Sequence, residues 1–344
     1  MARILLADDG IVFDGTSLEA GPLGGVESSV VNLMIELAKR GHEVHVRNNC
    51  ANQLDYKGVS WRPIGEAWPK QVDLYIANRG DKLIRYMPNA KKTVFWVHNP
   101  ARYLMKWRYL SKLWLTKPTI IFIGHVHKKT YPGWAPGGER VVIPYGLSED
   151  FCNAKPSGEV PAPRAVFTSN PLRSLDWLID LWVNHIRPKV PIAELHIFAG
   201  ASTYGAVGAA KGEAMESVLR KANSLTNHGI VIRGPVSKSQ LIKEFSSARC
   251  MLYRGDINET FCLAVGEAQA MGVPAVVKRY GSVVERVLDG QTGFIAGDDS
   301  EFADAAIKLL TDNELWRHQH LTALKKQRSW RWSDAAAAFE NLIG

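Results

Sequence analysis

Two glutamates, Glu259 and Glu267, are spaced so that both side chains could reach one bound substrate. Thr260 can cap a helix that begins near Phe261, which leaves Glu259 in the loop before that helix. Glu267 follows about two turns into the helix, on nearly the same face as Thr260, because one turn takes about 3.6 residues. A helix N-terminus attracts anions through its unpaired N–H groups and its dipole. The pattern predicts a sugar-nucleotide site, with the diphosphate at the helix start and the carboxylates at the sugar hydroxyls and the ribose diol.

The alternative is that both glutamates are ordinary solvated residues, as most glutamates are. The surrounding residues weigh against it, since 259–274 reads ETFCLAVGEAQAMGVP. This segment resembles the hallmark of glycosyltransferase family 4, the retaining GT-B enzymes, in which the two glutamates stand in E-x-F-G-L-x-x-x-E-A-x-A-x-G-x-P. Cys262 replaces the usual glycine. The resemblance implies that Glu259 positions the donor sugar and that Glu267 binds the ribose.

The resemblance extends over nearly the whole chain. The family's glycine loop corresponds to residues 23–27, where the amides of Gly24 and Gly25 would face the leaving diphosphate. Its end-of-domain signature corresponds to residues 142–146. Its terminal helix, introduced by an S-W segment, corresponds to Ser329–Leu342 and would pack back on the N-terminal domain.

His98, in the stretch FWVHNP, matches a histidine that the family places near the donor sugar. The resemblance implies a hydrogen bond to a sugar hydroxyl and support of positive charge at the anomeric carbon. The alternative is a structural histidine at a strand end. Val236 matches a position whose backbone borders the nucleobase in the family. Glu259 and His98 are therefore the expected catalytic residues.

One motif departs from the family pattern, and it concerns the donor phosphates. The family shows G-R-L-x-x-x-K-G after the first strand of its second domain, whereas residues 167–174 read FTSNPLRS. Arg173 replaces the lysine and can bind phosphate through two N–H groups, but Thr168 replaces the arginine. Arg79 and Arg254 are the candidates for the missing cation. The expected donor-binding residues are Gly24, Gly25, Arg173, Val236, Thr260, Phe261, Leu263 and Glu267.

The reaction would depend on stabilising the leaving diphosphate and aligning the acceptor. No Asp-x-Asp sequence occurs in the chain, so we expect neither a metal on the diphosphate nor another cofactor. The resemblance implies a hexosyl- or other glycosyltransferase (EC 2.4) that retains the anomeric configuration by front-face return, with the leaving phosphate as base. The acceptor hydroxyl would belong to cell-surface polysaccharide, glycolipid or natural-product glycoside synthesis.

Two other classes of function remain as alternatives. Nucleotide-sugar epimerases and phosphorylases share the two-domain architecture, but their own site signatures are not visible here. A pI near 9.2 is typical of nucleic-acid binders. No RRM, KH or zinc-finger motif accompanies it, so we expect no nucleic-acid partner.

Histidines and cysteines give weak signals for a metal site. His125 and His127, in GHVHKK, are spaced like ligands on one face of a strand, but no third ligand lies near, which favours a structural role. The cysteines contain no CxxC pair, so neither a zinc site nor a disulfide framework is predicted. They are Cys50, Cys152, Cys250 and Cys262.

Positive charge is concentrated in one part of the chain. The net charge is +8, and no acidic residue occurs between Asp81 and Glu139, an interval with eleven lysines and arginines. Residues 101–117, ARYLMKWRYLSKLWLTK, mix five of these cations with four tryptophans and tyrosines. One hypothesis is an amphipathic helix that touches an anionic membrane and reaches a lipid-linked acceptor. The alternative is a helix whose apolar face packs on its own sheet.

The alternation of short apolar runs with helical periods predicts two Rossmann-like, doubly wound parallel-sheet α/β domains that face each other across a cleft, the GT-B fold. The predicted parts are an acceptor-binding domain at 1–152, a linker at 153–163, a nucleotide-sugar-binding domain at 164–328 and a terminal crossing helix at 329–344. No run is apolar enough to span a bilayer, and the N-terminus lacks the features of a signal peptide. We therefore expect a cytoplasmic protein, with peripheral attachment to the inner face of the membrane if the basic segment binds lipid.

Overall fold

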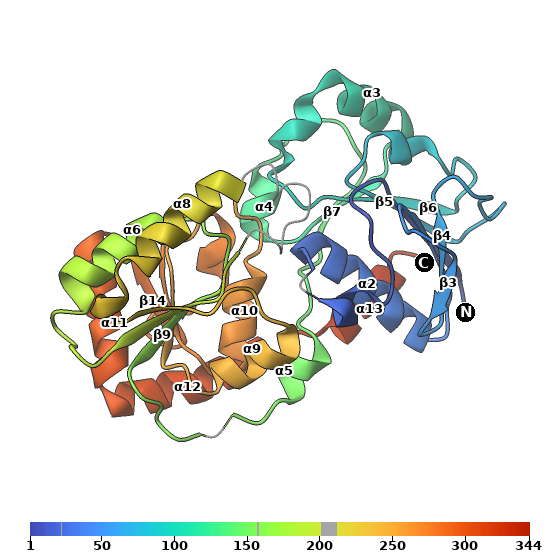
Figure 1. Cartoon of the computed structure of the whole chain (residues 1–344). Helices are drawn as coiled ribbons and strands as arrows, with labels where there is room; N and C mark the ends of the chain where they lie inside the picture. The colour runs from blue at the N-terminus through green and yellow to red at the C-terminus, as the bar shows by residue number, and fades with distance from the viewer. Residues whose placement is uncertain (22, 157, 201–211) are drawn as a thin grey trace. The chain divides into compact units, whose positions relative to one another are not determined.

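The computed structural model describes residues 1–21, 23–156, 158–200 and 212–344. These residues divide into two compact α/β units, which Figure 1 shows. Unit 1 comprises Met1–Gly146 and Arg331–Gly344, and unit 2 comprises Leu147–Trp330. Each unit is built on its own sheet, as the alternating pattern of the sequence predicts.

The chain enters unit 2 earlier than the sequence predicts. Leu147 and Phe151 are buried in the core of unit 2, so the boundary lies before residue 147 rather than after residue 152. The stretch predicted as a linker, 153–163, also belongs to unit 2, apart from residue 157, which lies outside the described residues. Its backbone is held there by Arg328, whose Nη2 donates to the carbonyl of Ala154 at 2.8 Å.

Unit 1 contains an eight-stranded sheet in the order β3-β4-β2-β1-β5-β6-β7-β8. Its strands are β1 (Arg3–Asp8), β2 (Glu43–Asn48), β3 (Leu54–Tyr56), β4 (Val59–Pro63), β5 (Leu74–Asn78), β6 (Lys92–Trp96), β7 (Thr119–Phe122) and β8 (Arg140–Val142). The strand order reverses between β1 and β5, since β2 to β4 lie on one side of this point and β6 to β8 on the other. Open α/β sheets bind ligands in the crevice at the carboxyl ends of the strands at such a reversal.

The hairpin of β3 and β4 is absent from the sequence prediction, and it supplies the one antiparallel pair of this sheet among the described residues. Its turn consists of Lys57 and Gly58, which both have positive φ (47° and 79°). Two consecutive residues with positive φ are typical of a two-residue type I′ turn, whose twist matches the right-handed twist of the flanking strands. Lysine is an unusual first residue for that turn, which is why the hairpin gives no sequence signal.

Among the described residues, six helices or short helical turns accompany this sheet before the chain reaches unit 2, and one follows at the C-terminus. They are α1 (Ser17–Ala20), α2 (Gly25–Lys39), the 3₁₀ turns Lys82–Arg85 and Ala101–Met105, α3 (Trp107–Thr116), α4 (His125–Lys129) and α13 (Trp332–Glu340). Figure 1 shows α13 beside α2. Glu340 of α13 binds Arg40 and His42, and Phe339 packs its ring edge against Trp96. The C-terminal helix thus belongs to unit 1.

Unit 2 contains a six-stranded parallel sheet in the order β11-β10-β9-β12-β13-β14. Its strands are β9 (Arg164–Phe167), β10 (Glu194–Ile197), β11 (Ile230–Ile232), β12 (Cys250–Tyr253), β13 (Ala275–Lys278) and β14 (Gly293–Ala296). Within the part of unit 2 that the structure describes, the α-helices are α5 (Glu149–Asn153), α6 (Leu175–Leu181), α8 (Gly212–Asn223), α9 (Lys238–Phe245), α10 (Leu263–Ala270), α11 (Asp299–Thr311) and α12 (Asn313–Gln327). Here the strand order reverses between β9 and β12.

Within the described part of the chain, every helix is too short or too polar to cross a bilayer.

Candidate functional site

Helix α10 begins at Leu263, so the predicted start near Phe261 is wrong. Cys262, just before it, has a left-handed backbone with φ 62° and ψ 72°, which cannot continue a right-handed helix. Cys262, and not Thr260, therefore occupies the N-cap position. Glu267 is the fifth residue of α10, about one turn from its start rather than two.

The left-handed backbone at Cys262 explains why glycine suits this position of the motif. Glycine reaches positive φ without steric strain, whereas a residue with a Cβ is strained there. The Cys262 side chain is nevertheless buried, and burial together with the neighbouring Glu259 raises the pKa of its thiol well above the usual value. The thiol is therefore held in its neutral form.

We expect Cys262→Gly to change the free energy of unfolding by less than about 1 kcal/mol. Relief of left-handed strain, about 1–2 kcal/mol, is offset by the loss of a small buried side chain and by the greater freedom of glycine in the unfolded chain. Cys262→Val should destabilise the protein by about 2 kcal/mol, since a β-branched side chain tolerates positive φ poorly. Denaturant unfolding measures both changes. A valine variant as stable as the wild type would contradict the strained backbone at residue 262.

Glu259 is buried in the loop between β12 and α10, where two side chains donate to its carboxylate. Arg173 Nη1 lies 2.5 Å from Oε1, and the Tyr253 hydroxyl donates to Oε2. Burial raises the pKa of Glu259, against the opposing effects of the Arg173 charge and the Tyr253 hydrogen bond. The Arg173 and Tyr253 side chains thus hold the buried carboxylate in place, and the alternative of a solvated glutamate is wrong. Tyr253 gives no motif in the sequence; only its place at the end of a predicted strand hints at a site residue.

Arg173 and Glu259 come from loops that follow neighbouring parallel strands, β9 and β12. The strand order of unit 2 reverses between these two strands, and open α/β sheets bind ligands at that point of their carboxyl edge. The Arg173 side chain is 41% exposed, so its guanidinium can donate to an anion as well as to Glu259. At the position of the family's first arginine, the Thr168 hydroxyl is buried without a hydrogen-bond partner among the described residues.

Glu267, one turn into α10, is buried and bound by a lysine. Lys238 Nζ, at the start of α9, lies 2.6 Å from both carboxylate oxygens of Glu267. The Lys238 side chain is 43% exposed, which leaves one side of the pair open to solvent. Lys238 was not among the expected residues, although it stands only two positions after Val236, the residue expected at the nucleobase.

The remaining expected donor residues of unit 2 are held by packing. Phe261 is buried beneath the Arg286 guanidinium, whose carbon lies 4.3 Å from the ring centroid. Leu263 and Val236 are half-buried and pack against the core of unit 2. Thr260 is half-buried in the loop before α10. Residues with apolar side chains in these positions can form hydrogen bonds to a polar ligand only through their backbone N–H and C=O groups.

Arg254, which follows β12, lies between two aromatic rings. Its guanidinium carbon is 5.2 Å from the Trp177 ring centroid and 4.9 Å from that of Tyr280, and Nη2 contacts the Tyr280 hydroxyl at 3.3 Å. Such cation–π contacts orient an arginine without neutralising it. Arg254 therefore retains its charge beside the strand end that also carries Tyr253 and Glu259.

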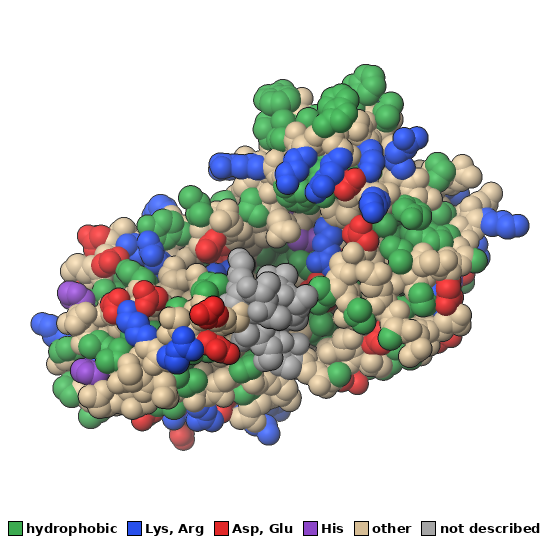
Figure 2. Space-filling view, turned by 45° about the horizontal axis from the view of Figure 1, so that its top comes forward, with side chains coloured by type: hydrophobic (Ala, Val, Ile, Leu, Met, Phe, Trp, Pro, Cys, Tyr) green, Lys and Arg blue, Asp and Glu red, His purple; other side chains and the backbone are tan. Residues whose placement is uncertain are grey.

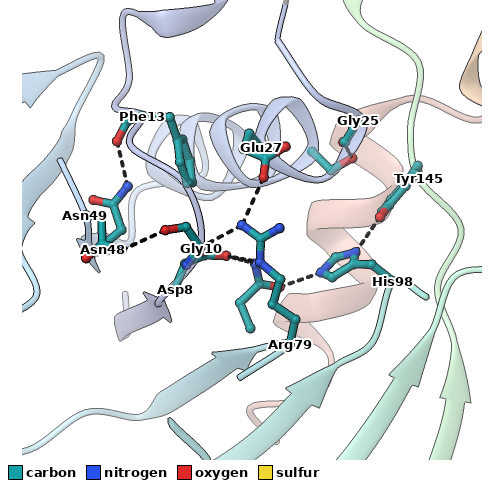
Figure 3. Close-up of polar contacts among 12 residues, drawn as sticks. Asp8, Gly10, Phe13, Gly25, Glu27, Asn48, Asn49, Arg79, His98 and Tyr145 are labelled. Atoms are coloured by element: carbon teal, nitrogen blue, oxygen red, sulfur yellow. Dashed lines mark hydrogen bonds and ion pairs between the residues drawn. The ribbon is translucent and has the colours of Figure 1, made fainter. Parts of the chain in front are cut away.

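Arg79, the other candidate for the missing cation, is already paired in unit 1, as Figure 3 shows. Its Nη2 lies 2.9 Å from both Asp8 Oδ1 and Glu27 Oε1, and Nε lies 3.0 Å from Asp8 Oδ2. Both carboxylates are buried, and their charges raise the pKa of Arg79 against the lowering effect of burial. Asp8 and Glu27 compensate its positive charge within unit 1. Arg79 is therefore poorly placed to replace the phosphate-binding arginine that the family has at the position of Thr168.

His98 follows β6 and is buried in the same network (Figure 3). Its Nε2 lies 2.5 Å from Asn78 Oδ1, and Nδ1 contacts the Tyr145 hydroxyl. Asn78 Nδ2 donates to Asp8, which orients the amide oxygen toward His98. Burial, with the nearby Arg79 charge, lowers the pKa of His98 well below its usual value. The imidazole is therefore neutral, and a hydrogen bond to a sugar would need one of these contacts to open.

The glycine loop precedes α2 in unit 1. Gly24 occupies the N-cap position and Gly25 begins the helix, with no side-chain cap. A Cβ at Gly24 would lie 2.3 Å from Glu27 Oε2, so a larger residue would displace the carboxylate that holds Arg79. The N-terminal amides of α2 thus have the geometry expected of an anion site.

A cavity of about 430 Å³ lies at the carboxyl ends of the central strands of unit 1. It is lined by Asp9, Gly10, Ile11, Arg79, Gly80, Asp81, Asn99, Tyr103 and Tyr109. The residues follow β1, β5 and β6, so the cavity coincides with the strand-order reversal between β1 and β5.

His125 and His127 lie on helix α4, not on a strand as the spacing predicts. His127 is buried, its Nε2 contacts the carbonyl of Asn99 at 2.8 Å, and burial lowers its pKa to about 4. These contacts give it a structural role. Among the described residues, no group of three His, Cys, Asp or Glu side chains is placed to hold a metal ion.

Comparison with known proteins gives a family match to part of the chain, which includes Arg173, Glu259 and Glu267. Residues 162–312 match the family model described as glycosyl transferases group 1. The fold is similar to that of sucrose-phosphate synthase from Thermosynechococcus elongatus, with a TM-score of 0.73 at 14% identity over 99% of this chain and 98% of that chain. It is also similar to that of Anabaena HepE, solved in complex with UDP-glucose, with a TM-score of 0.73 at 14% identity over 99% of both chains. At these identities the similarity shows the fold, which is GT-B.

Matches to curated relatives are shorter. D-inositol 3-phosphate glycosyltransferase of Corynebacterium diphtheriae is 29% identical over 119 residues, which are 34% of this chain and 28% of the relative. N-acetyl-alpha-D-glucosaminyl L-malate synthase of Bacillus anthracis is 44% identical over 62 residues, 17% of this chain and 16% of the relative. The matched segments therefore span about a quarter or less of these relatives.

Proposed function

We propose that this chain, which has the GT-B fold and carries a group 1 glycosyltransferase domain at residues 162–312, transfers a sugar from a nucleoside-diphosphate sugar to an acceptor hydroxyl. The observation that carries the proposal is the pair of Glu259 and Arg173 at the strand-order reversal of unit 2. In this proposal the Glu259 carboxylate accepts from sugar hydroxyls, and the adjacent Arg173 guanidinium donates to phosphate oxygens. The UDP-glucose complex of HepE supports the class of donor.

The role proposed for each cation depends on whether it already forms ion pairs within the protein. Arg173 is partly exposed and can stabilise the leaving diphosphate while it orients Glu259 toward the sugar. Arg254, rather than the doubly paired Arg79, supplies the second cation. Lys238 holds Glu267 so that the carboxylate can accept from the ribose diol.

The finer features of the reaction belong to the same proposal. Glu259 accepts from both Arg173 and Tyr253, an arrangement that suits positioning of the donor rather than covalent attack. Transfer would then retain the anomeric configuration by front-face return, with the leaving phosphate taking the acceptor proton. The charges of Arg173 and Arg254 would stabilise the leaving group without a metal ion, and the sugar would be a hexose or a related unit.

The cavity of unit 1 is the proposed place for the acceptor. It lies at the strand-order reversal of its own sheet, and its wall combines aromatic rings with carboxylates, the lining expected for a hydroxylated ligand. Gly10 in its wall leaves room for the Arg79 side chain, because a Cβ there would lie 2.0 Å from Arg79 Nη2.

A panel of nucleotide sugars tests the function. The protein should be stabilised thermally by one nucleoside-diphosphate sugar, since a ligand at 100 times its Kd adds about 2.7 kcal/mol. Incubation of that donor with candidate acceptors should then release the nucleoside diphosphate. Release of a sugar 1-phosphate would indicate a phosphorylase, and an epimerised donor would indicate an epimerase. A salt-sensitive gel shift without any nucleotide-sugar binding would instead favour the nucleic-acid alternative.

A further inference from the structure

Helix α3 of unit 1 presents large apolar side chains to solvent. Trp107 is 79% exposed, Trp114 66% and Leu115 59%. Positions seven and eight residues apart lie on one side of a helix, so these three side chains form one face, called here the α3 face. The opposite side of the helix buries Tyr109 and Leu113 in the core of unit 1. The helix is thus anchored by one side, and packing on its own sheet does not account for the other.

Cations surround the α3 face. Arg102, Lys106 and Lys117 are exposed at the two ends of the helix, and within the described residues none of them forms an ion pair. Figure 2 shows basic side chains gathered below a group of hydrophobic ones over this part of unit 1. The surface therefore combines apolar and positive groups.

The elements packed against α3 add more positive charge than negative. The 3₁₀ turn Lys82–Arg85 contacts α3 and carries two exposed cations. The nearby acid, Asp81, is bound by Lys112 at 2.7 Å and lies 3.5 Å from Arg108. Its charge is therefore largely compensated, and the net field around the α3 face is positive.

We propose that the α3 face docks unit 1 on an anionic lipid surface. Tryptophan is suited to the membrane–water interface, where its ring is buried while its N–H stays hydrated. The surrounding lysines and arginines would each be attracted to the negative surface of an anionic leaflet. Exposed indoles and a leucine on one helix face suit insertion into lipid. Binding to a nucleic-acid backbone needs positive charge but no exposed apolar side chains, so it would leave this face unexplained.

Docking in this way has a consequence for the acceptor, which rests on the proposed function. Tyr103 and Tyr109 line the cavity assigned to the acceptor, and they belong to the same segment as the α3 face. Tyr109 is on the buried side of α3, so a lipid surface bound at the α3 face would lie across this one helix from the cavity. The chemistry points to an acceptor whose hydroxylated head group is carried by a membrane lipid.

Vesicle co-sedimentation of the full chain tests the docking without any donor, so its result is separate from that of the transfer assay. We expect binding to vesicles containing phosphatidylglycerol at low salt, at least tenfold weaker binding at 500 mM salt because of screening, and little binding to pure phosphatidylcholine. Trp107→Ser combined with Trp114→Ser should weaken binding at least tenfold. Lys106→Glu combined with Lys117→Glu should weaken it similarly and reduce its salt dependence.

Matched changes on α12 of unit 2 provide the control. Leu321 is 65% exposed there and Lys325 is also exposed, so Leu321→Ser with Lys325→Glu should leave vesicle binding unchanged. Thermal unfolding of each variant checks that it folds. Absence of binding to anionic vesicles at low salt would overturn the proposal, as would equal losses from the α3 and α12 variants. Binding to nucleic acid or to an acidic protein without vesicle binding would overturn it as well.

Discussion

Glu259→Gln should lower kcat/KM for sugar transfer by about 10²–10³-fold, the loss typical of one group that stabilises a transition state. Glutamine keeps the size of the side chain but removes the charge that pairs with Arg173 at 2.5 Å. It also alters the acceptor for the Tyr253 hydroxyl. Both the position of the donor sugar and the orientation of the phosphate-binding guanidinium would be affected, so kcat should fall as well as donor affinity. Steady-state kinetics with the donor and acceptor identified by the panel measure the change.

Two measurements make this result specific to Glu259. Glu314→Gln changes a glutamate whose side chain is 84% exposed on α12, and it should retain wild-type turnover. Thermal unfolding of Glu259→Gln should show a loss of only about 1–2 kcal/mol, because the partly exposed Arg173 can turn toward solvent. Wild-type turnover by a folded Glu259→Gln variant would show that the site is wrongly assigned.

Glu267→Gln should raise KM for the donor by about 10–100-fold, with kcat within about threefold of the wild type. The reason is that a contact to the ribose is made equally in the ground state and the transition state, so its loss weakens binding without slowing the chemistry. A charged hydrogen bond contributes about 1.5–3 kcal/mol, which corresponds to this range. Donor titration and initial rates measure the two constants separately.

Lys238→Met is the matched variant for Glu267. Lys238 touches the carboxylate at 2.6 Å and acts by positioning it, so its loss should raise KM in the same direction. Because the two residues act as a unit, the double variant should be no worse than the worse of the two single ones. A fall in kcat with unchanged KM for Glu267→Gln would contradict a role at the ribose and would place this carboxylate at the reacting sugar instead.

The architecture was largely predictable because its strands are buried on both faces. Such strands appear as short apolar runs, as CMLY at β12 (Cys250–Tyr253) and AVVK at β13 (Ala275–Lys278) illustrate. The β3–β4 hairpin was not predictable, since its strands are short and its turn uses a lysine at positive φ. Helix α8 was also missed, although Met215, Val218, Leu219 and Ala222 recur at helical spacing, so its sequence does carry a periodic signal.

The candidate site was predictable as a set of residues but not as a set of contacts. Glu259 and Arg173 were assigned to separate parts of the donor, and their pairing joins residues 86 positions apart, which no local pattern records. Lys238 and Tyr253 carry no motif and become visible only through their hydrogen bonds to Glu267 and Glu259. The start of α10 was misplaced because the left-handed turn at residue 262 depends on the fold of the loop rather than on a capping side chain.

A crystal structure of the protein with the donor selected by the nucleotide-sugar panel is the most direct test of the central claim. We expect the diphosphate within hydrogen-bond distance of Arg173, the ribose at Glu267 and the transferred sugar at Glu259, all at the strand-order reversal of unit 2. A donor bound elsewhere, with the Glu259–Arg173 pair untouched, would contradict it. So would a protein that binds no nucleotide sugar in the panel.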